Sequence, residues 1–101
     1  MSVVLCVTLW SNPGHEETLV SYEDSVLALL PEHGARVVAR VRAETSAEGK
    51  VGDGHPFETQ IIELPDQAAL DAYLADPRRG AASDVRDRAI ARTEIQRVTL
   101  T

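Results

Sequence analysis

The feature that most constrains the fold is an apolar run near the start of the chain that lacks a polar face. Residues 3–10 read VVLCVTLW, and nearly every position is apolar or β-branched, which predicts a β-strand. Because successive side chains of a strand point to opposite faces, both faces of this strand need cover. The 101 residues suffice for one domain, over residues 1–101, that buries only about 60–70% of its surface when folded alone. A partner is therefore expected to supply the missing cover.

Apolar periodicity along the rest of the chain predicts three helices and three further strands. Over residues 15–33, apolar side chains recur at three- and four-residue steps, which is typical of an amphipathic helix. Pro31 could kink this helix or end it early, and Gly34 is expected just after its C-terminus. The remaining elements are a helix that opens at Pro65, a helix over about 77–92, and strands over 35–44, 57–64 and 94–100.

The order of these elements is the split βαβ pattern of a ferredoxin-like βαββαβ fold. Right-handed crossovers place all the helices on one face of an antiparallel four-stranded sheet, so the expected fold class is α+β. The other face is left to solvent or to a partner, and a second copy of the chain related by a two-fold axis is the simplest partner. We therefore expect a homodimer formed through the sheet faces.

Several short motifs follow one another in the order of a known superfamily. They are Pro13-Gly14-x-Glu16, Tyr22-Glu23, HGARVVAR at 33–40, IELP at 62–65 and YLADP at 73–77. With these motifs nearly the whole chain resembles the dimeric α+β barrel superfamily. It is most similar to short, stand-alone members of largely uncharacterised function, related to antibiotic-biosynthesis-monooxygenase-like proteins. The resemblance implies a dimeric barrel with a pocket between the sheet and the helices of each subunit. It implies an activity only broadly, because the superfamily includes cofactor-free monooxygenases, isomerases, polyketide cyclases and haem proteins.

The composition excludes several kinds of partner. With 16 acidic and 10 basic residues the formal charge is −6, which argues against nucleic-acid binding because such binding depends on basic surface. No apolar run approaches the ~20 residues that span a bilayer, and the first residues lack the basic region of a signal peptide. We therefore expect a cytoplasmic protein without a membrane partner. The single cysteine, Cys6, rules out an internal disulfide and a multi-cysteine zinc site.

Three histidines are the first candidates for chemistry. His15 stands at a predicted helix start, where a neutral imidazole could act as a general base or could simply be exposed to solvent. His33 could line the cleft, or it could take a packing or capping role at the end of the same helix. His55 lies in a glycine-rich loop over 45–56 that could act as a lid. Its acidic neighbours do not match a known metal-ligand spacing, so no metal and no cofactor are expected.

Arg40 and Glu63 form a second candidate pair because they lie on two strands that are expected to pair as a hairpin. Strand alternation could place both side chains on the same sheet face, where a carboxylate beside an arginine must be paired or hydrogen-bonded. The pair could anchor an anion and act as a base, or it could form a salt bridge that fixes the dimer register. A single β-bulge would reverse this placement.

Aromatic residues are only 4% of the chain, so a cluster of them would be informative. Trp10 ends the first strand, and Tyr22 and Tyr73 lie on the apolar stripes of the first two helices. Each combines an apolar body with one hydrogen-bonding group, which suits an aromatic ligand, although aromatics at helical spacing also build cores. The candidate substrate-binding residues are therefore Trp10, Tyr22, Tyr73 and His55, and the candidate catalytic residues are His15, His33, Arg40 and Glu63.

Three functions agree with these features. The first is a cofactor-independent monooxygenase, isomerase or cyclase acting on a small apolar or aromatic, polyketide-like substrate, as in a specialised biosynthetic pathway. A histidine or a carboxylate would move a proton, and Arg40 or Tyr22 would stabilise an enolate-like anion. The second is a non-catalytic homodimer that holds a ligand or a partner protein. The third is a haem or metal protein, which the scattered histidines make the weakest.

Overall fold

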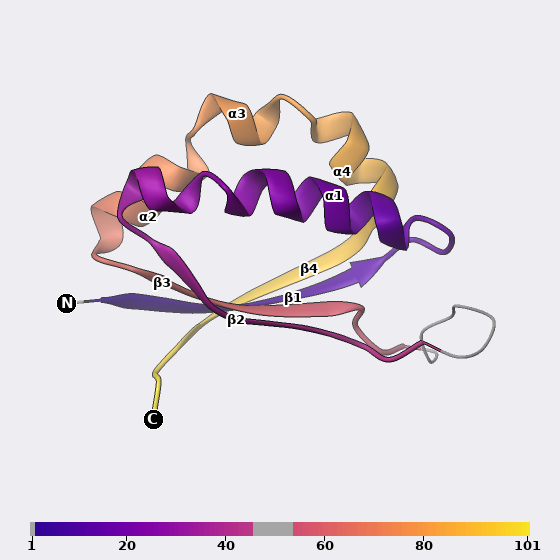
Figure 1. The fold of residues 1–101 in the computed structure, drawn as a ribbon, viewed down its shortest axis with the longest axis horizontal. Coiled ribbons are helices and arrows are strands. Elements are labelled where there is room, and N and C mark those ends of the chain that lie inside the picture. Colours follow the sequence, from indigo (N-terminus) through magenta and orange to yellow (C-terminus); the bar gives the residue numbers. More distant parts are fainter. Residues whose placement is uncertain (1, 46–53) are drawn as a thin grey trace.

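The computed structural model describes residues 2–45 and 54–101. In this part of the chain four strands form one antiparallel sheet in the order β2-β3-β1-β4, with the helices along one face (Figure 1). The elements are β1 (Val3–Ser11), α1 (Glu16–Leu27), η1 (Leu30–His33), β2 (Arg36–Arg42), β3 (Glu58–Leu64), α2 (Gln67–Leu74), α3 (Pro77–Gly80), α4 (Ser83–Ala89) and β4 (Ile90–Val98). The α+β, ferredoxin-like arrangement is confirmed. Most of the loop expected to act as a lid lies outside the described residues.

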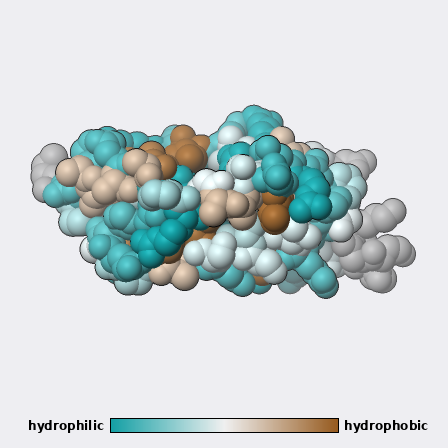
Figure 2. Space-filling model, turned by 90° about the horizontal axis from the view of Figure 1, so that it is seen from above, coloured by the Kyte–Doolittle hydropathy of each residue, from teal (hydrophilic) through white to brown (hydrophobic). Residues whose placement is uncertain are grey.

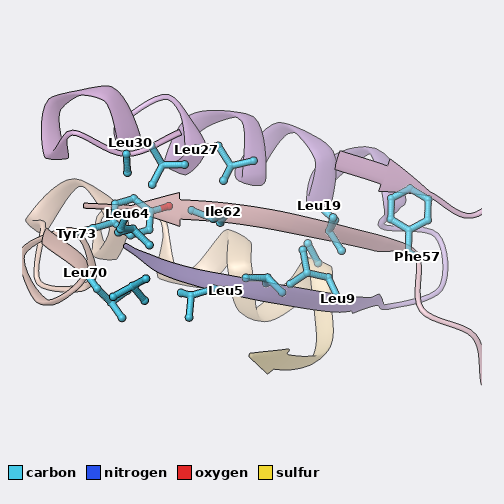
Figure 3. Close-up of a cluster of buried hydrophobic side chains, with 14 residues drawn as sticks. Leu5, Leu9, Leu19, Leu27, Leu30, Phe57, Ile62, Leu64, Leu70 and Tyr73 are labelled. Atoms are coloured by element: carbon cyan, nitrogen blue, oxygen red, sulfur yellow. The ribbon is translucent and has the colours of Figure 1, made fainter. Parts of the chain in front are cut away.

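β1 lies in the middle of the sheet between β3 and β4, as its apolar sequence predicts. Alternate side chains from Val3 to Leu9 face the helices and are buried. Figure 3 shows Leu5 and Leu9 on the sheet, with Leu19, Leu27 and Leu30 in the helical layer above it. This layer between helices and sheet is the core, and any cleft within it has an apolar floor.

The helical region expected over 15–33 is divided in two. α1 ends at Leu27, and the following 3-10 turn η1 has Pro31 near its start. Proline lacks an N–H group and clashes with the preceding turn, so a regular α-helix does not continue through it. Gly34 then adopts a left-handed conformation at φ 70°, as expected for a residue that ends a helix, and leads the chain into β2.

The helix expected over 77–92 and the strand expected from 94 have different boundaries. The helix is broken after Gly80 into α3 and α4, and β4 begins at Ile90. Ile90 already pairs with Ser11 of β1, and the Asn12 side chain donates a hydrogen bond to the carbonyl of Arg88 at 2.8 Å. These contacts with the end of β1 start the strand earlier than its sequence pattern indicates. As a result, residue 93 lies within the sheet.

A shift of register in β2 overturns the expected pairing of Arg40 with Glu63. Before the shift, which follows Val37, Arg36 lies opposite Glu63; after it, Arg40 lies opposite Gln60. Glu63 and Gln60 are on opposite faces of β3 because they are three residues apart. The prediction that Arg40 and Glu63 share a face is therefore wrong, and the irregularity in β2 is the reason.

The two faces of the molecule differ in cover. The helical layer presents a mostly hydrophilic outer surface with small hydrophobic patches (Figure 2). The opposite side of the sheet, here called the open face, carries no helix among the described residues (Figure 1). None of the described helices is long and apolar enough to cross a membrane.

Candidate functional site

A cleft lies between the helical layer and the sheet. The enclosed part of the cleft is small, about 80 Å³, which is below the roughly 300–1,000 Å³ of small-molecule sites, and the rest of the cleft opens to solvent. Val7 and Leu9 of β1 contribute to its floor, and the exposed side chains of Leu74 and Ile95 line it as well. Its polar lining consists of Tyr22, Glu23, Gln60, Tyr73, Arg79, Arg86 and Thr93.

Glu23 is the buried carboxyl group of this cleft. It occupies the inward stripe of α1 between Leu19 and Val26, and it is only 6% exposed. Its Oε1 accepts a hydrogen bond from Nε2 of Gln60 at 2.8 Å. Burial raises the pKa of Glu23, and the hydrogen bond from Gln60 offsets only part of that effect. Glu23 is thus a carboxyl group that holds its proton to a higher pH than an exposed one.

Glu58 is equally buried but is held in its charged form. It accepts hydrogen bonds from Nε of Arg40 at 2.8 Å, Nε of Arg42 at 2.7 Å and Nε2 of Gln60 at 2.6 Å. Burial alone would raise the pKa of Glu58, but these hydrogen bonds outweigh it and lower the pKa. Arg40 also donates to Asp24 at 2.5 Å. The role of Arg40 is therefore to neutralise carboxylates beside the cleft.

The two tyrosines predicted to bind substrate both line the cleft. The hydroxyl of Tyr22 donates to the main-chain carbonyl of Arg79 at 3.3 Å, and that of Tyr73 donates to the carbonyl of Val26 at 3.1 Å. Burial raises the pKa of both tyrosines, and the nearby charge of Arg79 counteracts this. Both hydroxyls therefore stay neutral, and the rings form apolar walls.

The candidate histidines of the helical layer lie outside the cleft. His15 is exposed at the start of α1. His33 ends η1, where its Nε2 lies 3.0 Å from Oδ2 of Asp76 and its ring packs edge-on against Tyr73 at 5.8 Å between centroids. The hydrogen bonds that Asp76 accepts from Arg78 and His33 lower the pKa of this carboxyl. His33 thus joins two helical segments, which is the packing role that the sequence left open.

The remaining candidates lie elsewhere. The ring of Trp10, in β1, is covered by the guanidinium of Arg92 at 4.6 Å, and its Nε1 donates to the carbonyl of Gly54 at 3.1 Å. His55 is exposed and borders a shallow hollow beside Phe57.

Glu63 lies on the open face, where its Oε1 accepts a hydrogen bond from Nε of Arg36 at 3.0 Å. Of the eight predicted site residues, the cleft brings together only Tyr22 and Tyr73.

Sequence reasoning missed five polar residues of the cleft, which are Glu23, Gln60, Arg79, Arg86 and Thr93. Glu23 follows Leu19 by four residues and precedes Val26 by three, so helical spacing alone places it on the buried stripe. Gln60 is two residues from Ile62 on β3, so both side chains point to the same face, under the helices. Arg79 and Thr93 carry no such signal, because their positions depend on the break after α3 and on the early start of β4.

The chemistry available to this cleft is proton transfer and hydrogen bonding. Within residues 2–45 and 54–101, no group of three or more histidine, cysteine, aspartate or glutamate side chains is arranged to hold a metal ion. The side-chain amide of Gln60 donates to two carboxyl groups, Glu23 and Glu58. The hydrogen bonds from two arginines keep Glu58 ionised, whereas Glu23 can gain and lose a proton. Carboxyl groups whose environments separate their pKa values in this way are typical of acid–base sites.

The sheet order, the helices on one face and the cleft between them define a small ferredoxin-like α+β protein. The chain belongs to the family described as domain of unknown function DUF1330, whose model matches residues 10–98. No functionally curated protein matches it.

Solved structures share this fold at low sequence identity. A protein of unknown function from Rhodopseudomonas palustris is 18% identical, with a TM-score of 0.75, covering 99% of this chain and 82% of that one. A dimeric ferredoxin-like protein of unknown function from Jannaschia sp. CCS1 is 15% identical, with a TM-score of 0.67 and coverages of 99% and 100%. A candidate antibiotic biosynthesis monooxygenase from Bacteroides thetaiotaomicron is 15% identical, with a TM-score of 0.69 and coverages of 98% and 89%. At these identities the likeness extends to the fold alone.

Proposed function

We propose that this protein is a cofactor-independent isomerase, cyclase or monooxygenase that moves a proton on a small apolar or aromatic, polyketide-like substrate. The observation that carries the proposal is Glu23, a buried carboxyl group in a largely apolar cleft. Burial raises its pKa above the ordinary value, which is the direction that favours a carboxylate as a general base. The substrate would lie against the rings of Tyr22 and Tyr73.

In the proposed reaction, Glu23 takes a proton from a carbon next to a substrate carbonyl, and an enolate forms. Return of the proton to another carbon completes an isomerisation. Attack by the enolate carbon on a second carbonyl closes a ring, and the alkoxide that results takes the proton back from Glu23. One-electron transfer from the enolate to O₂ gives superoxide and a substrate radical, which combine and take the proton from Glu23 to form a hydroperoxide, and loss of water leaves a new carbonyl. The hydrogen bond from Gln60 fixes the orientation of the Glu23 carboxyl group. The apolar floor excludes water, which strengthens the electrostatic contacts to the enolate.

The comparison with the candidate antibiotic biosynthesis monooxygenase supports the proposal only at the level of the fold. The proposal assigns no catalytic step to His15, His33, Arg40 or Glu63, because none of these side chains lines the cleft. It retains Tyr22 and Tyr73 as substrate contacts. It also includes a homodimer joined through the open faces of two sheets, since β1 has apolar side chains on that face as well.

The test is exchange of substrate carbon-bound hydrogen with deuterium. 2-Tetralone, a two-ring ketone with acidic hydrogens beside its carbonyl, is incubated with the protein in D₂O and followed by proton NMR. The wild-type protein should accelerate the exchange, and Glu23→Gln should slow the catalysed rate by about 100-fold or more. Glu17→Gln, at an exposed position of the same helix, should leave it unchanged. Equal rates in the wild-type protein and Glu23→Gln would rule out Glu23 as the base.

A non-catalytic ligand-binding protein is the second candidate. It is favoured by the hydrogen bonds that the cleft already makes: Tyr22 and Tyr73 donate to main-chain carbonyls, and Glu23 accepts from Gln60. Such groups can serve as packing alone. For this candidate, 2-tetralone would bind without any exchange above the rate in buffer.

A further inference from the structure

The wall of the cleft contains two polar atoms without partners. Nε of Arg79 and Oγ1 of Thr93 are both buried, and neither has a hydrogen-bond partner among the described residues. Both residues line the cleft. A buried donor without an acceptor is costly, and most such groups in folded proteins are satisfied. These two atoms therefore indicate where a polar group of a ligand would bind.

The contacts of Arg79 hold its guanidinium group at this wall. The group lies over the ring of Tyr73, with its central carbon 4.7 Å from the ring centroid. Nη1 donates to the carbonyl of Leu74 at 3.4 Å, and the carbonyl of Arg79 itself accepts from Tyr22. These contacts orient the side chain while Nε remains free to donate.

Two arginines bring positive charge to this wall. Arg79 and Arg86 both line the cleft and counteract the raised pKa of Tyr22. Arginine has donors only and remains charged in proteins, and a threonine hydroxyl can donate to the same acceptor. The complementary group is an oxygen that accepts hydrogen bonds and carries negative charge.

The sheet register gives the distance between the two ends of the site. Thr93 lies opposite Leu9, and Gln60, which holds Glu23, lies opposite Val7 on the other side of β1. Thr93 and Gln60 are thus two strand spacings apart across the sheet, about 9–10 Å, and two residues apart along it, about 7 Å, so they are about 12 Å from each other.

We infer that the cleft binds a small apolar molecule through one anionic oxygen, a carboxylate or an enolate-type oxygen, held by Nε of Arg79 and the hydroxyl of Thr93. This inference rests on the proposed function, because it names the substrate class of the same cleft. The sequence predicts that Arg40 or Tyr22 stabilises an anion, but Arg40 does not line the cleft and is bonded to Glu58 and Asp24. Arg79 takes that role.

Isothermal titration calorimetry with matched probes tests the inference. Naphthalene-2-carboxylate carries the anion, and its methyl ester has the same rings without the charge. The wild-type protein should bind the carboxylate at least about tenfold more tightly than the ester, and sodium chloride should reduce this preference. 2-Naphthol is the enolate-like probe: its bound form should ionise at a lower pH than in buffer, as seen in the absorption of naphtholate.

Variants assign the anion contact to particular side chains. Arg79→Met keeps most of the side-chain volume over Tyr73 and should weaken carboxylate binding by about 10–100-fold while sparing the ester. Thr93→Val removes one hydroxyl with little change of shape and should weaken it by about 2–10-fold. Arg88→Met removes an exposed arginine of α4 that does not line the cleft, and it should bind like the wild-type protein.

The inference fails if the carboxylate and the ester bind equally, if none of the probes binds, or if neither Arg79→Met nor Thr93→Val weakens binding more than Arg88→Met does. A preference for naphthalene-2-carboxylate over its ester would show that the site binds a carboxylate. A lowered ionisation pH of bound 2-naphthol would show that it binds an enolate-type oxygen. These measurements need no turnover. Anion preference without hydrogen exchange would overturn the proposed catalysis alone, and exchange without anion preference would overturn this inference alone.

Discussion

Glu23 and Glu58 show how neighbouring side chains decide the charge of a buried carboxyl group. Both are buried and both accept a hydrogen bond from Gln60. Glu58 also accepts from Arg40 and Arg42, which lower its pKa despite burial, whereas burial dominates at Glu23 and raises its pKa. The two guanidinium groups therefore keep Glu58 ionised and leave Glu23 as the group that can gain and lose a proton.

This difference predicts a pH dependence of stability. Because the folded pKa of Glu23 is raised, its contribution is fully present below the ordinary value of 4.5 and is lost as pH rises through the folded pKa. Glu23→Gln keeps the acceptor for Gln60 and cannot ionise. In urea unfolding from pH 4 to 8, the variant should match the wild-type protein at the acid end and become progressively more stable than it at higher pH.

Glu17→Gln is the control, since Glu17 is an exposed carboxyl group of the same helix. Its difference from the wild-type protein should stay small across the range. A constant difference between Glu23→Gln and the wild-type protein at every pH would mean that the Glu23 carboxyl is not perturbed by burial.

Part of the site could be predicted from the sequence, residue by residue. Helical spacing identifies Tyr22 and Tyr73 as inward-facing, and the same spacing applied to Glu23 would have found it. Polar residues on a buried stripe are easily assigned to solvent when composition alone is considered. Arg79 could not be placed, because an arginine in a helix is usually exposed and only the break after α3 turns it inward.

At the scale of elements, the order of strands and helices is predictable and their irregularities are not. Period-two and three-to-four-residue spacing identify the strands and helices from local sequence. The register shift after Val37 and the early start at Ile90 depend instead on contacts with distant strands. The shift reverses which β2 side chains face the helices, and it is the reason that Arg40 joins Glu58 instead of Glu63.

The boundary between η1 and β2 depends on a single residue, Gly34. Its φ of 70° is a conformation that other residues adopt at a cost, and an added Cβ would meet Cγ of Pro65 at 3.4 Å. Gly34→Ala should therefore reduce the free energy of unfolding by about 1–2 kcal/mol, measured by urea denaturation. Gly80→Ala is the matched control, because Gly80 is helical, has no positive φ and has nothing within 4 Å of an added Cβ. It should be neutral or stabilise by up to about 1 kcal/mol, and equal losses at both sites would contradict the strain argument.

At the scale of the whole molecule, the open face is the side of the sheet that no helix of the described residues covers. Cys6 and Ile61 are cross-strand neighbours at its centre, and Val41 nearby is 60% exposed. Ion pairs flank this apolar centre, between Arg36 and Glu63 and between Arg92 and Glu94. An apolar centre with balanced charges at its edges suits contact with an identical surface across a two-fold axis.

Ile61→Glu tests the homodimer because it places a charge at the centre of the open face without touching the cleft. Native mass spectrometry of the wild-type protein should show a species of twice the 11.0 kDa chain mass, and the variant should shift toward the monomer, because burying an unpaired carboxylate in an interface is unfavourable. Ala72→Glu adds the same charge at an exposed position of α2 and should leave the dimer intact. Circular dichroism of the variants checks that the fold is kept. A monomeric wild-type protein would show that the sheet is stable with this face in water, and a dimer that survives Ile61→Glu would show that the chains join through another surface.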